Sequence, residues 1–344
     1  MICVDRSDKI LFNLSSEKTM SNIFAIFDSF LPFQKRQEPH LAATITKAAS
    51  KQTYYTIRFL VDRDLVIDAY RAYAYFRWVD DCLDSETGSP PERIAFVNRQ
   101  QSILETCYRG GTPGNVNVEE RMLVDLVKND AEKNSGLQSY LRNMMAVMAF
   151  DVERRGRVIS QVELSEYSRL LSTAVTEALH YFIGHHCPSP CSETRYLAVR
   201  GAHIVHMLRD AVEDPAAGYF NIPGEYIETQ GISFQEMDSP AYREWVSARV
   251  ILARGCFRRG REYLAQVKNL RCRLAGYAYL ARFEWMLGAI ERDGYRLRAA
   301  YPERKTLWAG LWMAWMTLSS LFTLQRLNKD PRELPVQSAQ YDER

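Results

Sequence analysis

Hydrophobic residues recur at intervals of three and four along most of the chain, which is the spacing of an amphipathic α-helix. The longest such stretches cover residues 64–84, 137–153, 162–182, 193–213, 241–266 and 272–300. No stretch alternates apolar and polar residues as a half-buried β-strand does, and no strand–helix–strand rhythm occurs. The pattern therefore predicts an all-α protein of about ten or more helices.

Glycine and proline gather between these stretches, where they are typical of turns and helix ends. They fall in residues 85–92, 109–115, 187–191, 214–224 and 301–303. No internal repeat and no low-complexity segment interrupts the helical pattern. We therefore expect one helical domain over residues 41–327. It would follow a partly amphipathic N-terminal extension (1–40) and precede a disordered tail (328–344).

The composition is that of a globular protein and argues against several classes of partner. Apolar residues make up 47% and charged residues 25%, and the net charge of +2 indicates no nucleic-acid partner. Seven scattered cysteines, an odd number, do not form a disulfide framework, which favours a reducing, cytoplasmic setting. The charged N-terminus lacks the apolar core of a secretory signal. No glycine-rich dinucleotide motif follows a strand, so NADPH is not indicated.

One segment near the C-terminus carries no formal charge from Leu307 to Gln325. Its 19 residues are just long enough to cross a bilayer, and Trp308, Trp312 and Trp315 share one helical stripe. We expect a final helix that is buried or that contacts the membrane surface, in preference to a true membrane span. The protein is then cytoplasmic, with a peripheral membrane contact through residues 307–325 as an option.

Two acidic pairs carry the candidate chemistry. Asp80 and Asp84 lie four residues apart in YAYFRWVDDCLD (73–84), so they share one helix face, with Arg77 and Tyr73 on the turns before them. Asp81 lies about 100° away from that stripe. Asp210 and Asp214 repeat the spacing in HIVHMLRDAVED (203–214), behind His203 and His206. Pro215 should end the second helix at the motif, and the PAAG that follows could close over the site.

Two helices that each end in a carboxylate pair predict a site for a hard divalent cation. Magnesium prefers oxygen ligands and usually binds through a few carboxylates together with substrate phosphates. A bound divalent cation would stabilise the charge that develops when diphosphate leaves an allylic carbon. Arg77 and Arg209 could donate hydrogen bonds to the phosphate oxygens. The carbocation needs an aromatic, dry pocket, which 19 Tyr, 15 Phe and 6 Trp can supply.

These residues carry a resemblance to the squalene/phytoene synthase family of head-to-head isoprenoid synthases, over about residues 45–305. Residues 73–84 resemble the first aspartate-rich motif of the family, and MLRDAVED with Gly218 and Pro223 resembles the second. SKQTYY (50–55) is similar to a segment that lines the phosphate site, and Asp151 and Tyr167 fall where the family keeps an Asp and a pocket Tyr. The resemblance implies a single-domain class I isoprenoid synthase-like helical bundle around a central apolar cavity. It also implies two or three Mg²⁺ ions, with Mn²⁺ as a substitute, and an all-trans prenyl diphosphate of fifteen or twenty carbons as substrate.

Site residues are assigned by the same resemblance. The metal ligands would be Asp80, Asp84, Asp210 and Asp214, with Asp81 and Glu213 behind them. The diphosphate would be held by Ser50, Lys51, Arg77, Arg209 and Tyr219. Asp80, Asp84, Tyr73, Tyr167 and His206 would be the catalytic residues.

The chain departs from the family pattern around the second motif. His203 and His206 stand where the family has Gln and Asn, and imidazole is a poor magnesium ligand, so His206 would contact diphosphate or carry a proton. The lid reads Gly218-Tyr219-Phe220-Asn221 and lacks the family's cation. Small residues after the pocket Tyr are replaced by Ser172, Thr173 and Thr176, which should reshape the hydrocarbon channel, and Glu284 stands near an expected late Tyr.

These departures leave three functions open. Family membership favours head-to-head condensation, and a single-substrate terpene cyclase on the same scaffold is the alternative. An inactive homologue that assembles with other proteins or binds lipid is a third reading, which the retention of all four aspartates argues against. HHCPSPC (185–191) offers potential zinc ligands at no common spacing, and RRGR (154–157) is interpreted as a solvated helix end.

Overall fold

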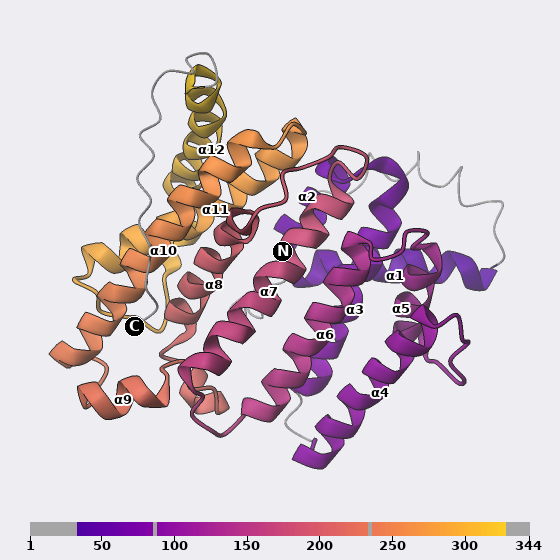
Figure 1. Cartoon of the computed structure of the whole chain (residues 1–344), viewed down its shortest axis with the longest axis horizontal. Coiled ribbons are helices and arrows are strands. Elements are labelled where there is room, and N and C mark those ends of the chain that lie inside the picture. The colour runs from indigo at the N-terminus through magenta and orange to yellow at the C-terminus, as the bar shows by residue number, and fades with distance from the viewer. Residues whose placement is uncertain (1–32, 85–87, 233–235, 328–344) are drawn as a thin grey trace.

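The computed structural model describes residues 33–84, 88–232 and 236–327, and within them it confirms the all-α prediction (Figure 1). Twelve α-helices make up this part of the chain: α1 (Phe33–Ala49), α2 (Lys51–Leu60), α3 (Val66–Leu83), α4 (Pro90–Tyr108), α5 (Val118–Asn129), α6 (Gly136–Arg154), α7 (Gln161–Phe182), α8 (Leu197–Asp210), α9 (Gly224–Gln230), α10 (Pro240–Gln266), α11 (Leu270–Arg292) and α12 (Leu307–Leu327). The predicted domain start at residue 41 falls inside α1. Residues 1–32 of the predicted extension and the predicted tail, 328–344, lie outside the described residues.

Side-chain caps explain where many of the helices begin. The capping residue in front of a helix accepts a hydrogen bond from a backbone N–H of the first turn at Ser50, Asn117, Ser135, Ser160, Ser239 and Asn269. Each cap satisfies a donor that has no partner inside its helix. The turn predicted at 85–92 extends too far, because α4 already begins at Pro90. Ser89 and Glu92 form a capping box at the start of this helix.

One predicted helix is too long at its C-terminal end. The hydrophobic pattern predicts helix as far as residue 300, whereas α11 ends at Arg292. Gly294 and Tyr295 have φ angles of 61° and 62°, in the left-handed region that an α-helix does not use. Glycine adopts this conformation readily, but nothing in the local sequence indicates that Tyr295 does so.

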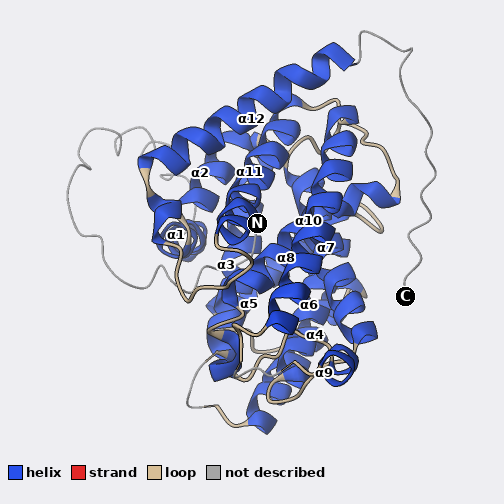
Figure 2. Ribbon diagram, turned by 90° about the vertical axis from the view of Figure 1, so that its left-hand side faces the viewer, coloured by secondary structure: helices blue, strands red, loops and turns tan. Residues whose placement is uncertain are grey.

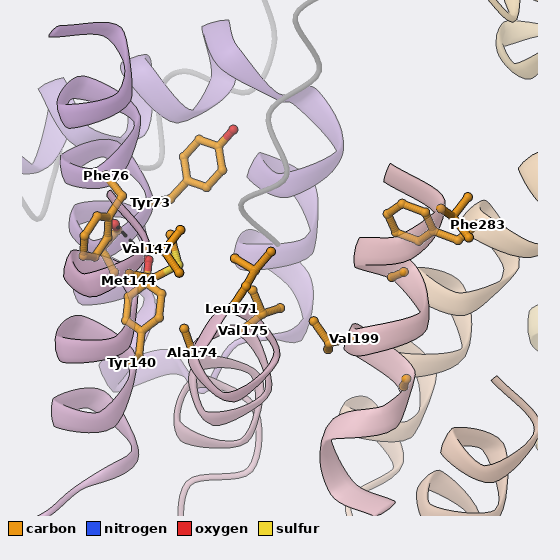
Figure 3. Packing of buried hydrophobic residues seen from close by; sticks show 14 of the residues in the cluster. Tyr73, Phe76, Tyr140, Met144, Val147, Leu171, Ala174, Val175, Val199 and Phe283 are labelled. Atoms are coloured by element: carbon orange, nitrogen blue, oxygen red, sulfur yellow. Dashed lines mark hydrogen bonds between the residues drawn. The ribbon is translucent and has the colours of Figure 1, made fainter. Parts of the chain in front are cut away.

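The walls of the interior are α3, α6, α7 and α8, which bury aromatic and aliphatic side chains against one another. Figure 3 shows Tyr73 of α3 and Tyr140 and Met144 of α6 on one side, with Leu171 and Val175 of α7 beside them. All five are less than a tenth exposed. Burial of so much apolar surface is the main force that assembles the bundle.

Glycine lets α8 approach α10 closely behind this wall. A Cβ placed on Gly260 of α10 would lie 2.8 Å from the Cβ and 2.9 Å from the Cα of Ala198 in α8. A Cβ on Gly201 of α8 would lie 2.8 Å from the ring of Phe257. The close approach fixes the position of α8, the helix that carries the second aspartate motif.

Helix α12 lies along one edge of the molecule against α11 (Figure 2). Arg261 of α10 pairs with Glu284 of α11 and donates a hydrogen bond to Ser320 of α12, so these three residues hold the helix in place. The resemblance led us to expect a Tyr near the position of Glu284. Glu284 instead forms this ion pair with Arg261. The opposite face of α12 exposes Trp308 by 80% and Trp315 by 70%. Among the described helices, none has the length and apolarity that crossing a bilayer requires.

The predicted membrane-surface contact can be tested at the exposed tryptophan face of α12. Trp308→Ser with Trp315→Ser should weaken binding to anionic lipid vesicles by about tenfold or more, because the indole rings lose their burial at the interface. Co-sedimentation with vesicles measures this binding. Val162→Ser on α7, where the side chain is 76% exposed, is the control and should bind as the unaltered chain does. Equal binding of the double variant and the control would contradict the prediction.

Candidate active site

Both aspartate pairs open onto one cavity of about 150 Å³, here called the carboxylate cavity. It is lined from α3, α6, α7, α8 and the segment after α8, by residues that include Asp80, Asp84, Asp151, Tyr167, His203, His206, Asp210, Asp214, Tyr219 and Asn221. The sequence placed Asp80 and Asp210 about 130 residues apart, and the fold brings them to one site. The four predicted metal ligands therefore face a common space.

The cavity lies where two helices end. Helix α3 ends at Leu83 with Asp84 as its cap residue, and α8 ends at Asp210, four residues before Asp214 opens a short 3₁₀ turn. This confirms the prediction that the second helix ends at its motif. The C-terminal end of a helix carries a partial negative charge. Two such ends and their carboxylates give the cavity a strong attraction for cations.

Arg77 balances the first aspartate pair. Its guanidinium lies 3.4 Å from a carboxylate oxygen of Asp80 and donates to both oxygens of Asp81, with Nε 3.0 Å from Oδ2. Burial lowers the pKa of Arg77, but the two carboxylates outweigh this effect and hold the pKa above its usual value. Asp81, predicted to stand behind the metal ligands, thus binds Arg77. Neither residue lines the carboxylate cavity.

Asp210 is held in the second motif by two neighbours. Arg209 donates to both of its oxygens at 2.6 and 2.7 Å, and Nδ1 of His206 lies 3.0 Å from Oδ2. The other ring nitrogen of His206 lies 3.0 Å from Nη2 of Arg209. Burial raises the pKa of Asp210, but His206 and Arg209 together bring it well below its usual range. Asp210 is therefore a carboxylate at neutral pH. Glu213 does not line the cavity.

Arg154 is a central residue of the site that the sequence interpretation missed. The RRGR run was assigned to a solvated helix end, but Arg154 is buried, with its guanidinium 4.8 Å from the ring centres of both Tyr167 and Tyr219. It donates to Asp151 at 2.7 Å and to Asn221 at 2.8 Å. The interpretation failed because a short basic run has no periodicity that distinguishes a buried arginine from exposed ones.

Arg154 connects the mid-chain aspartate to the second motif. Asn221 donates to Asp214 at 2.6 Å, and the hydroxyl of Tyr167 donates to Asp151 at 3.1 Å. One chain of hydrogen bonds therefore runs from Asp214 through Asn221, Arg154 and Asp151 to Tyr167. Asn221 also went unassigned as a site residue, since its partner is seven residues back across a turn.

The lid segment after the second motif is fixed to the end of α6. The amide of Gly156 donates to the carbonyl of Gly218 at 2.8 Å, and Phe220 pairs with Val158 in an isolated bridge. Gly218 has a φ of 85°, which glycine adopts without strain. Tyr219, assigned to diphosphate by the resemblance, lines the cavity, and burial, with Asp151 and Asp84 nearby, raises its pKa to about 12. Tyr219 is thus a neutral phenol in the lining of the site.

A separate apolar cavity of about 100 Å³ lies beside the carboxylate cavity along the bundle. On α6, α7 and α8 the two cavities are lined by residues four apart: Tyr140 and Met144, Val175 and Leu171, Val199 and His203. Four residues along a helix span about 6 Å, so the two spaces are one turn apart. Figure 3 shows the side chains of Leu171, Val175 and Val199 at this level. The predicted central apolar cavity is confirmed. Ser172, Thr173 and Thr176, expected to reshape it, do not line either cavity.

Ser50 and Lys51 lie in a third hollow, here called the basic groove, of about 760 Å³ between the start of α2, α11 and α12. The groove is lined by residues that include Ser50, Lys51, Tyr73, Arg282, Arg304 and Lys305. Tyr73 and Arg282 also line the apolar cavity. The predicted diphosphate residues are thus divided: Tyr219 faces the carboxylate cavity, Arg77 and Arg209 pair with its aspartates, and Ser50 and Lys51 lie elsewhere.

The comparisons with known proteins agree with this geometry. A family model described as squalene/phytoene synthase matches residues 46–311, well over half of the chain. The chain belongs to the squalene/phytoene synthase family. This is a family of prenyltransferases that act on prenyl diphosphates. No match was found among curated proteins.

A solved structure has the same fold as this chain. The chain is similar to a crystal structure of a dehydrosqualene synthase in complex with ligand, with a TM-score of 0.62 and 15% sequence identity. The alignment covers 87% of this chain and 99% of that one. The predicted isoprenoid synthase fold is therefore confirmed. Most of α12 lies beyond the end of the family match at residue 311.

Squalene/phytoene synthases typically depend on Mg²⁺, and the oxygen donors here suit that ion in kind. Within residues 33–84, 88–232 and 236–327, no three His, Cys, Asp or Glu side chains are grouped closely enough to hold a metal, and this covers the His–Cys loop at 185–191. At the second motif, Arg209 and His206 occupy the oxygens of Asp210. A cation bound at Asp80, Asp84, Asp210 and Asp214 would neutralise the negative charge of these carboxylates, which arginines balance in this structure.

The hydrogen-bond chain through Arg154 predicts a large cost for its removal. Arg154→Leu should lower the free energy of unfolding by about 3 kcal/mol, because Asp151 and Asn221 lose their buried partner. Urea denaturation measures the loss. Arg157→Leu in the same basic run is the control: its pair with Glu163 is exposed, so the loss should stay under about 1 kcal/mol. Equal losses in the two variants would contradict the assignment of Arg154.

Proposed function

We propose that this chain ionises an all-trans allylic prenyl diphosphate, of farnesyl or geranylgeranyl type, and joins two such molecules head to head. The observation that carries the proposal is the meeting of both aspartate pairs in one cavity, one helical turn from an apolar cavity. A diphosphate headgroup requires the first environment and a prenyl chain requires the second. A substrate that spans both would place its reacting carbon at their junction.

At the headgroup end, Asp80, Asp84, Asp210 and Asp214 would hold Mg²⁺, and bound Mg²⁺ would stabilise the negative charge of the leaving diphosphate. Arg77 and Arg209 already form ion pairs with aspartates of these motifs. In the proposed complex their guanidinium groups turn to the phosphate oxygens, where planar donors form paired hydrogen bonds. Tyr219, a neutral phenol, adds a donor from the lid.

At the hydrocarbon end, the side chains exclude water from the carbocation. Tyr73, Tyr140 and Phe283 line the apolar cavity, and an aromatic ring stabilises a cation that lies over its negative face. The apolar lining disfavours water there, which would lengthen the life of a carbocation until it reacts with a carbon–carbon double bond.

The basic groove supports the use of a second substrate. Lys51 and Arg282 are cations beside the apolar cavity, and Tyr73 lines both spaces. A second diphosphate bound at Ser50 and Lys51 would direct its prenyl chain into the same apolar cavity. A cyclase, which ionises one molecule only, does not need a second anion site.

A single-substrate terpene cyclase is the second candidate, and one observation favours it. The basic groove shares no lining residue with the carboxylate cavity, so one substrate can bind and ionise without Lys51. The inactive-homologue reading has less support. Burying Arg154 beside the partly buried Asp151 costs free energy that an inert protein could avoid with apolar residues, as Arg–carboxylate replacements in other proteins show.

Ionisation is tested by Mg²⁺-dependent release of diphosphate from farnesyl and geranylgeranyl diphosphate. Asp80→Asn should lower the release rate by about 100-fold or more, because the cation loses a charged ligand. Asp125→Asn on α5, a carboxylate that pairs with Arg71, is the control and should keep the full rate. The proposal is wrong if the unaltered chain releases no diphosphate, or if Asp80→Asn releases it normally.

Condensation and cyclisation are separated by the carbon count of the product. Chromatography should find a hydrocarbon with twice the carbons of the substrate, and Lys51→Ala should abolish it while the first ionisation continues. Lys47→Ala on α1, outside the groove lining, is the matched control. A product with the carbon count of the substrate, unchanged by Lys51→Ala, would establish the cyclase.

A further inference from the structure

His203 is a buried side chain that lines the carboxylate cavity and has a ring nitrogen without a hydrogen-bond partner. It lies on α8 one turn before His206, lines the cavity and is only 4% exposed. Its Nε2 atom is buried and has no hydrogen-bond partner. A polar atom that is buried in this way destabilises the fold, so such atoms are rare and call for a functional explanation.

The surroundings of His203 keep it neutral. Its ring meets that of Tyr167 edge to face at 5.0 Å. Burial and then the nearby positive groups of His206, Arg154 and Arg249 bring the pKa of His203 well below its usual range. A neutral imidazole with its proton on Nδ1 carries its lone pair on Nε2.

We propose that Nε2 of His203 accepts the proton whose loss ends the carbocation reaction. This rests on the proposed function. In the step, a C–H bond next to the cationic carbon breaks and its electron pair forms the new C=C bond. The proton forms an N–H bond at Nε2, and no electron is gained or lost overall. The resulting imidazolium passes the proton to the departing diphosphate or to water when the site opens.

The other polar groups of the cavity are less suited to this step. Both ring nitrogens of His206 are engaged, one with Asp210 and one with Arg209. The hydroxyl of Tyr167 donates to Asp151, which also accepts from Arg154. His203 lies one turn from Val199 of the apolar cavity, so its ring stands at the junction where the cationic carbon would lie.

The test is His203→Phe, which keeps an aromatic ring but removes the lone pair. Diphosphate release should stay close to that of the unaltered chain, while the ratio of alkene to alcohol products falls by about 100-fold as water captures the cation. Thermal melting should show a variant as stable as the unaltered chain or more so, because the unpartnered nitrogen is gone. A structural role predicts the reverse, with lower stability and unchanged products.

Controls separate this inference from the proposed function. His180→Gln removes a histidine that bonds Tyr263 and lines neither cavity, so it should leave the product ratio unchanged. If His203→Phe does not fold, His203→Gln keeps a polar side chain that cannot accept the proton. Normal alkene ratios in a folded His203 variant would overturn the inference, as would weaker binding of inorganic diphosphate with unchanged products. Absence of diphosphate release from the unaltered chain would refute the proposed function instead.

Discussion

The structure depends on the concentration of negative charge where α3 and α8 end. Four aspartates and two helix C-termini face one cavity, and so much unbalanced charge in a half-buried space would be costly. Arginines balance it by pairing with these aspartates: Arg77 with Asp80 at the first motif and Arg209 with Asp210 at the second. Arg154 balances Asp151 beside them. The same charges that need arginines in the free protein suit a cation and a diphosphate in the proposed complex.

Because of this negative charge, the site has a polar end and an apolar end with different functions. The arginine-paired carboxylates hold the polar end, and the aromatic residues of α3 and α6 hold the apolar end one turn away. His203 lies at the boundary as a neutral group among charged ones. An ionised substrate would keep its anion near the first part and its cation near the second, so the two charges separate across residues suited to each.

Much of this was predictable from the sequence, and the failures have physical causes. The helices and the aspartate pairs follow from a local period, so α3 and α8 were placed within a few residues of their observed bounds. Arg154 was missed because burial of a charged residue depends on distant partners such as Asn221. The position of Lys51 depends on how α2 packs near α11 and α12, which no local pattern encodes. The end of α11 depends on the left-handed backbone of Tyr295.

The account depends on carboxylates from both helices binding the same cations. The most direct test is a crystal structure with Mn²⁺ and a non-hydrolysable prenyl diphosphate, read by the anomalous signal of the metal. The account predicts manganese bound by oxygens of Asp80 or Asp84 and of Asp210 or Asp214, with the side chain of Arg209 turned from Asp210 to the diphosphate. Manganese bound to one helix only, with the Arg209–Asp210 pair intact, would contradict it.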